Sequence, residues 1–213
     1  VEQLLNRGID IETRDESRNW STALIEASAQ GKTKTVLLLL EHGANVNAKD
    51  GHEHTALVYA TANGHIATIR LLLEHGADIN IHGGIMKSPV LMYAISNGSV
   101  ETVTFLLEHG ADLEAKDIFG QTPLMAASQK GNSKIVKVLL DHGANINIKD
   151  EVQGNTALIH ACAYGNTETV ALLLDHGADI KAKNKFGTTP LMIARQHNHQ
   201  DTIELLVQHG TKQ

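Results

Sequence analysis

The sequence has little of what several common classes of protein require. Its 213 residues include one cysteine, Cys162, which excludes an intramolecular disulfide and a cysteine-based zinc site. The longest purely apolar run, Val36 to Leu40, is far shorter than the roughly 20 residues that span a bilayer. Basic residues number 18 against 24 acidic ones and form no basic stripe. We therefore expect neither membrane insertion nor nucleic-acid binding.

Internal repetition is what the sequence has in abundance. A block of two leucines, an acidic residue, histidine, glycine and alanine recurs at residues 39–44, 72–77, 106–111, 139–144 and 173–178. A weaker copy spans 206–211, and a partial copy opens the chain at 4–8. A second block, such as Gln121 to Leu124, precedes every copy except the partial one, and its leucine always lies 19 residues before the glycine. The 14 to 16 residues that follow each glycine vary in number, so a rigid unit alternates with a segment that tolerates insertion.

The rigid part is typical of two short helices. Apolar residues such as Val36, Leu39 and Leu40 share one helical face. Threonines precede the first helix and suit an N-cap, where the hydroxyl accepts a hydrogen bond from an unpaired N–H: Thr22, Thr55, Thr122, Thr156 and Thr189. Glycines at 31, 64, 98, 131 and 165 are expected to end the first helices, and those at 43, 76, 110, 143, 177 and 210 the second. The polar insertion-tolerant segments, such as Ala48 to His54, predict surface turns or hairpins.

A single helix pair of this size cannot bury its apolar face alone, so stacked neighbours must cover it. The period near 33, the Gln121 to Leu124 block and the run from Leu72 to Asn80 resemble ankyrin repeats along essentially the whole chain. The resemblance implies an all-α ankyrin-repeat solenoid of stacked helix-turn-helix units joined by β-hairpin-like loops. We predict one domain over residues 1–213, with a partial repeat at 1–14 and repeats at about 15–49, 50–82, 83–116, 117–149, 150–183 and 184–213.

Two departures from the family pattern carry further expectations. The family usually has histidine after the Thr-Pro-Leu block, whereas this chain has apolar residues, which we expect to pack between repeats: Ile25, Val58, Met92, Met125, Ile159 and Met192. The first unit also lacks its first helix and would leave Val1, Leu4 and Leu5 uncovered, which predicts further chain upstream. We expect a cytoplasmic protein, with the periplasm and secretion as alternatives because the chain opens on Val1.

Histidine is abundant, but its spacing does not favour chemistry. Corresponding residues of stacked helices lie about 10 Å apart, too far to share one zinc ion with bonds of about 2 Å. We interpret the six histidines near the ends of the second helices as polar residues beside a helix C-terminus: His42, His75, His109, His142, His176 and His209. The pairs His52/His54 and His197/His199 have no clear third ligand, and Cys162 fills a slot for small buried residues. We therefore predict no metal, no cofactor and no catalytic residues.

The aromatic residues indicate a surface for a partner protein. In the family that this chain resembles, hairpin tips and the outer face of the first helix line a concave groove. Tyr59 and Tyr93 lie about 200° around the first helix from its buried leucine, and the apolar pair Ile85 and Met86 lies in the hairpin between them. The predicted surface also includes Glu26, Trp20, Phe119, His160, Tyr164 and Phe186. For the two phenylalanines the alternative is that they stiffen their hairpins.

We predict that the chain is a non-catalytic protein–protein interaction module or scaffold, a monomer that binds a partner protein through its concave face. One alternative is the targeting or substrate-recognition arm of a larger enzyme or secreted effector whose catalytic part lies outside this sequence. A further hypothesis, implied by the resemblance, is that Asn80 is a substrate for an asparaginyl hydroxylase.

Overall fold

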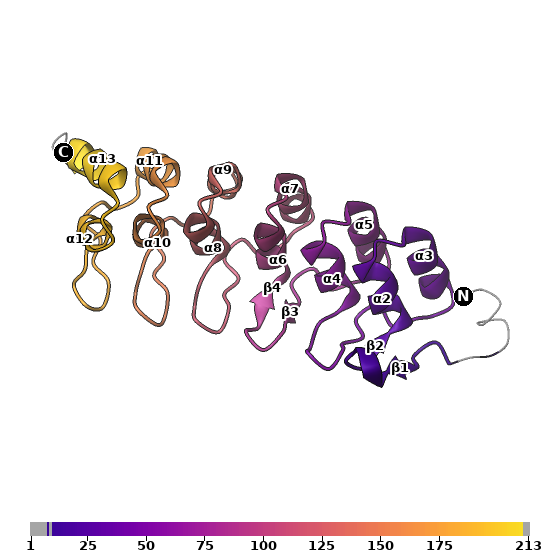
Figure 1. Ribbon diagram of the computed structural model, residues 1–213. Coiled ribbons are helices and arrows are strands. Elements are labelled where there is room, and N and C mark those ends of the chain that lie inside the picture. Colours follow the sequence, from indigo (N-terminus) through magenta and orange to yellow (C-terminus); the bar gives the residue numbers. More distant parts are fainter. Residues whose placement is uncertain (1–7, 9, 211–213) are drawn as a thin grey trace. The chain divides into compact units, whose positions relative to one another are not determined.

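The structure is a computed structural model that describes residue 8 and residues 10–210 (Figure 1). Most of the partial copy at 4–8, with Val1, Leu4 and Leu5, and the last residue of the weaker copy at 206–211 lie outside the described residues. Contacts divide the chain into two compact units, Val1–Ala111 and Asp112–Gln213. One helix pair falls within each of the six predicted repeat ranges.

The first unit contains three of these helix pairs and two short hairpins. Strand β1 (Arg14–Asp15) pairs antiparallel with β2 (Ser21–Thr22) around a 3-10 helix, η1 (Glu16–Arg18), and β3 (His82–Gly83) pairs antiparallel with β4 (Ser88–Pro89). A bridge between Lys49 and Thr55 closes the loop before the second pair. The helices are α2 (Ala23–Ala29), α3 (Thr33–Glu41), α4 (Ala56–Ala62), α5 (Ile66–Glu74), α6 (Val90–Asn97) and α7 (Val100–Glu108).

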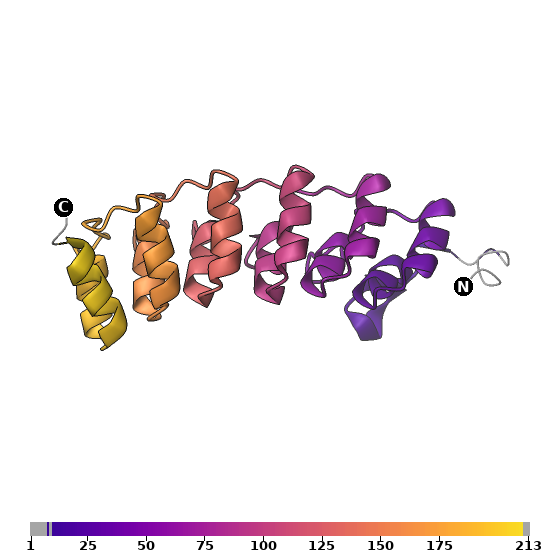
Figure 2. The same ribbon diagram turned by 90° about the horizontal axis from the view of Figure 1, so that it is seen from above.

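The second unit is built in the same way from three more pairs. Within this unit α8 packs on α10 and α10 on α12, and α9 packs on α11 and α11 on α13. Figure 2 shows the pairs of each unit following one another in chain order. The helices are α8 (Pro123–Lys130), α9 (Ser133–Asp141), α10 (Ala157–Ala163), α11 (Thr167–Asp175), α12 (Pro190–Gln196) and α13 (Gln200–Gly210).

The predicted start and stop signals are confirmed, with one exception. Each of the five threonines caps its helix, and its side chain accepts from the backbone N–H three residues later. The glycines after the first helices, and those after the first five second helices, have positive φ. The prediction that Gly210 ends the last helix is wrong, because α13 includes it and its φ is not positive. The other second-helix glycines precede an alanine whose N–H bonds back into the helix, as Ala44 does to Leu39 O, whereas Gly210 precedes Thr211.

The core runs through the helix pairs. The second helices bury one leucine at the same position in every pair, from Leu39 (1% exposed) to Leu206 (2% exposed). Five of the six apolar residues that replace the family's histidine are buried as predicted: Ile25, Val58, Met92, Met125 and Ile159. The sixth corrects the prediction, because Met192 is 57% exposed. It lies on the last helix pair, which no further described repeat follows.

Polar bonds join neighbouring repeats within each unit. Near the helix ends, His65 Nε2 lies 3.2 Å from Ala29 O, and His199 Nε2 lies 3.0 Å from Ala163 O. At the hairpins, backbone N–H groups donate to the preceding hairpin, as Gly51 does to Asn19 O (2.8 Å). In the second unit Glu151 N–H likewise donates to Phe119 O (3.0 Å) and Lys185 N–H to Gln153 O (2.8 Å). The hairpins that begin near Asp50, Asp150 and Asn184 are therefore each bonded to the hairpin before them.

Candidate protein-binding surfaces

In four of the six pairs, the residue four positions after the helix cap links the first helix to the hairpin before it. The Tyr59 hydroxyl donates to Asp50 Oδ2 (2.7 Å), and the Tyr93 hydroxyl donates to Gly83 O (2.9 Å). At the equivalent position in the second unit, His160 Nε2 lies 3.0 Å from Asp150 Oδ2. Glu26 occupies this position in the first pair and forms an ion pair with Arg18 (2.7 Å), which offsets its negative charge.

In the first unit His54 lies between the two tyrosines. Its ring meets Tyr59 and Tyr93 edge to face, with centroids 5.4 Å and 5.6 Å away. Because the Tyr93 hydroxyl spends its hydrogen on Gly83 O, the bond between His54 Nε2 and Tyr93 Oη (3.0 Å) requires the hydrogen on Nε2. His54 Nδ1 is then a buried atom with no hydrogen-bond partner among the described residues. A Cβ atom at Gly84 would lie 2.7 Å from His54 Nε2, so the hairpin needs glycine there.

This packing changes what the two tyrosines can offer a partner. Both are half-buried, and both hydroxyls are already bonded within the protein. A partner would therefore meet ring surfaces rather than free hydroxyl groups.

Burial also shifts the pKa values of the side chains that join the first helices to their hairpins. It raises the pKa of Tyr59 and of Tyr93 above the usual value, with the Asp50 carboxylate adding to both effects. Burial acts to raise the pKa of Asp50 too, but hydrogen bonds from the His54 backbone, the Tyr59 hydroxyl and the His52 backbone hold it below its usual value. Burial lowers the pKa of His54 and of His160, although a nearby aspartate opposes the effect in each case.

Predicted site residues on the hairpins of the first unit are exposed. Ile85 is 82% exposed and Met86 is 49% exposed, and both lie in the turn between β3 and β4. Trp20 is 50% exposed and sits just before β2 with a positive φ of 59°. We name the exposed apolar pair at the tip of the β3–β4 hairpin the tip patch: Ile85 and Met86.

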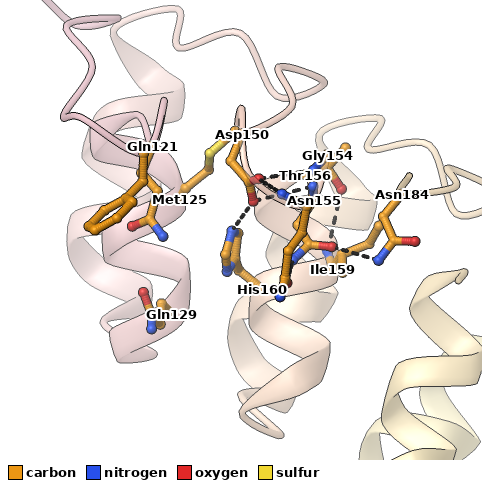
Figure 3. Close-up of polar contacts among 12 residues, drawn as sticks. Gln121, Met125, Gln129, Asp150, Gly154, Asn155, Thr156, Ile159, His160 and Asn184 are labelled. Carbon is orange, nitrogen blue, oxygen red and sulfur yellow. Dashed lines mark hydrogen bonds and ion pairs between the residues drawn. The ribbon is translucent and has the colours of Figure 1, made fainter. Parts of the chain in front are cut away.

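The second unit contains an open groove of about 810 Å³ between its hairpins and first helices. Phe119 (39% exposed) and Tyr164 (56% exposed) line it, as predicted site residues. His160 also lines it but is only 8% exposed, so it supports the floor through Asp150 rather than presenting a free ring (Figure 3). Phe186 is 75% exposed on the next hairpin and is not among the lining residues.

The residues considered for chemistry have structural partners instead. Each of the six helix-end histidines places Nδ1 within 3.0 Å of the carbonyl oxygen four residues earlier. Among residues 8 and 10–210, no three histidine, cysteine, aspartate or glutamate side chains are grouped to hold a metal ion. Cys162 is fully buried as predicted, and burial raises the pKa of its thiol to about 12. No helix within the described residues is long and apolar enough to cross a membrane.

Comparison with known proteins decides the family. A model of ankyrin repeats in three copies matches residues 1–83, 85–150 and 148–213. The chain belongs to the ankyrin repeat family. Among solved structures, the crystal structure of the human ASB11 ankyrin repeat domain is 27% identical, with a TM-score of 0.86, and the match covers 98% of this chain and 90% of that chain. No curated protein matches the sequence.

These findings confirm the predicted fold class, an all-α ankyrin-repeat solenoid. Ankyrin repeats are in general protein–protein interaction modules and are typically non-catalytic.

Sequence reasoning missed two features of these ankyrin repeats. One is the aspartate at the base of a hairpin: Asp50 and Asp150 each accept backbone N–H groups from the turn as well as the side chain of the helix. The other is the number of carboxamide side chains in the groove of the second unit. An overlay of the repeats would have aligned Gln121 with Asn155, which both directly precede a capping threonine, but it would not have brought all six carboxamides to one groove.

Proposed function

We propose that this ankyrin repeat chain is a non-catalytic, monomeric protein-binding module or scaffold. The observation that carries the proposal is the exposure of Ile85 and Met86 at a hairpin tip, where no core needs them. An exposed apolar pair of this kind marks an interaction site more often than it serves the fold. We also propose that the six repeats have the boundaries predicted above, since each range holds one helix pair.

The surroundings of the pair support a protein partner. Hydrogen bonds hold both half-buried tyrosine rings: the Tyr59 hydroxyl donates to Asp50, and the Tyr93 hydroxyl donates to Gly83 O and is also bonded to His54. Rigid aromatic side chains lose little conformational entropy on binding and are enriched among the residues that dominate interface energies. A partner that docks on the tip patch would therefore meet a base that is already ordered.

The test is a double variant at the exposed tip, Ile85→Ser/Met86→Ser, compared with Leu37→Ser/Val207→Ser. The control removes two apolar side chains that are 37% and 42% exposed on second helices. Proteins captured from the native source by the wild-type chain are purified, and their affinities are measured by calorimetry. We expect the tip variant to keep its melting temperature and bind at least tenfold more weakly, about 1.4 kcal/mol. Equal affinity of both variants for every captured protein would refute a role for the tip patch.

A further inference from the structure

The groove of the second unit has no exposed aspartate and no glutamate, lysine or arginine in its lining. Its one carboxylate, Asp150, is 5% exposed, and its oxygens accept hydrogen bonds from three backbone N–H groups and from His160. No lysine, arginine or glutamate lines the groove, although charged residues make up 20% of the chain. A charged side chain of a ligand would lose hydration there without gaining a partner of opposite charge.

Carboxamide side chains take the place of charges. Each of the three successive repeats contributes two to the lining: Gln121 and Gln129, then Gln153 and Asn155, then Asn184 and Gln196. A carboxamide carries both a donor and an acceptor, as a peptide group does. The side chains of Gln121 and Gln196 have no hydrogen-bond partner among residues 8 and 10–210, and Gln129 spends one N–H on the Tyr164 hydroxyl (2.7 Å). The first and the last of these repeats therefore each provide a carboxamide whose donor and acceptor can bond the peptide groups of a ligand.

Apolar contacts line the same groove. Phe119, Val152 and Tyr164 line it with 39%, 57% and 56% of their surfaces exposed, from the hairpins before α8 and α10 and from the end of α10. Aromatic and aliphatic surfaces beside polar groups suit a ligand that alternates apolar side chains with a solvated backbone.

The spacing of the repeats selects the conformation of that ligand. Packed helices lie about 8–10 Å apart, so equivalent positions of successive repeats, such as Gln121 and Asn155, recur at about that interval. A polyproline II helix has three residues per turn and rises about 3.1 Å per residue, so it presents the same face about every 9 Å. A β-strand presents the same face about every 7 Å and falls out of register. Polyproline II also leaves its backbone groups without internal hydrogen bonds.

We propose that the groove of the second unit binds an uncharged polyproline II segment of a partner protein with an apolar side chain at every third position. The inference rests on the proposed protein-binding function and gives the chemical class of one ligand. Carboxamides such as Gln121 and Gln196 bond the peptide groups, and Phe119, Val152 and Tyr164 receive the apolar side chains.

The test uses three fluorescein-labelled mixtures of nine-residue peptides, titrated with the whole chain and followed by fluorescence polarisation. The first has the pattern proline, any uncharged residue, then leucine, isoleucine or phenylalanine, repeated three times. The second has the same composition with no two apolar residues three positions apart. The third has the first pattern with glutamate or lysine at the middle position. We expect the first mixture to bind at least tenfold more tightly than either of the others.

Matched variants locate the binding. Gln121→Ala/Gln196→Ala removes two groove carboxamides that have no hydrogen-bond partner among the described residues, so the fold should not depend on them. Gln30→Ala/Gln200→Ala removes two exposed carboxamides outside the groove. The first variant should weaken binding of the patterned mixture at least tenfold, and the second should leave it unchanged.

The outcomes separate this inference from the proposed function. Equal binding of the first two mixtures, or equal binding by both variants, overturns the polyproline II inference even if the tip patch still captures proteins. If the patterned mixture binds as expected while no protein depends on Ile85 and Met86, the groove inference holds and the tip patch fails.

Discussion

At the scale of single residues, Gly131, which follows α8, meets two requirements at once. Gly131 has a φ of +71°, and a Cβ atom there would lie 2.5 Å from Asn166 Oδ1. That asparagine belongs to the next repeat, and its Nδ2 donates to Ser128 O and Gln129 O, each at 2.9 Å. Glycine therefore lets the chain reverse and also leaves room for the bond that joins two repeats.

Comparing two glycines separates these requirements. Gly143 has a φ of +88° with nothing within 4 Å of an added Cβ. Gly143→Ala should therefore carry only the cost of a left-handed alanine, about 1–2 kcal/mol. Gly131→Ala should lose at least about 1 kcal/mol more, because it displaces Asn166 and its hydrogen bonds. Urea unfolding of both variants measures the difference, and equal losses would show that the close approach carries no energy.

At the scale of elements, four of the six first helices are tied to the hairpin before them by a side chain that sequence reasoning placed on a free surface: Glu26, Tyr59, Tyr93 and His160. The N-caps were predictable because the threonine hydroxyl and the N–H that it meets are three residues apart in the same turn. The contact of His54 with Tyr93 joins residues 39 apart, and it depends on how closely the two hairpins approach. A helical wheel correctly places Tyr59 and Tyr93 away from the helical core. It describes one helix alone, so it cannot predict that a hairpin covers them.

The burial of His54 and His160 predicts how the stability of the protein depends on pH. Burial holds the pKa of His54 and of His160 below the ordinary value of 6.5, whereas the unfolded chain titrates near that value. Below about pH 6.5 the unfolded state binds more protons than the folded state. The free energy of unfolding therefore decreases as the pH is lowered, until the folded imidazoles also titrate. The groups that face His54 are Asp50, His52, Tyr59 and Tyr93, and Asp150 faces His160.

Chemical denaturation between pH 8 and pH 5 tests this dependence. His54→Gln/His160→Gln should show a shallower loss of stability than the wild type over that range, even if its absolute stability is lower. His42→Gln/His142→Gln, which removes two exposed helix-end imidazoles, serves as the matched control and should keep the wild-type slope. A slope that depends on the control pair instead would assign the effect to the helix ends.

At the scale of the whole molecule, the repeat period was readable from the sequence because every unit repeats the same blocks at the same distance. The groove of the second unit was not, because its chemistry is spread over three repeats. The sequence predicted a binding surface from its aromatic residues. The groove is defined as much by Gln129 and Gln196, which occupy equivalent places near the ends of α8 and α12. Only the fold brings those carboxamides to one surface.

Repeat architecture also predicts how damage spreads. Leu139 in α9 is 0% exposed, and α9 packs on α8 and α11. Leu139→Ala should cost about 2–5 kcal/mol as a truncation in the core, whereas Val207→Ala, at a side chain 42% exposed, should change stability by about 0.5 kcal/mol or less. Because each repeat contacts mainly its neighbours, local opening should follow the site of damage.

Hydrogen exchange followed by mass spectrometry shows where the protection is lost. In Leu139→Ala the amides of α8 to α11 should exchange fastest relative to the wild type, α12 and α13 should change less, and residues 10–111 should change least. Val207→Ala should leave the pattern of the wild type in both units. A uniform loss along the described chain would mean that the two units unfold as one cooperative body, and the division of the molecule at Asp112 would then have no energetic counterpart.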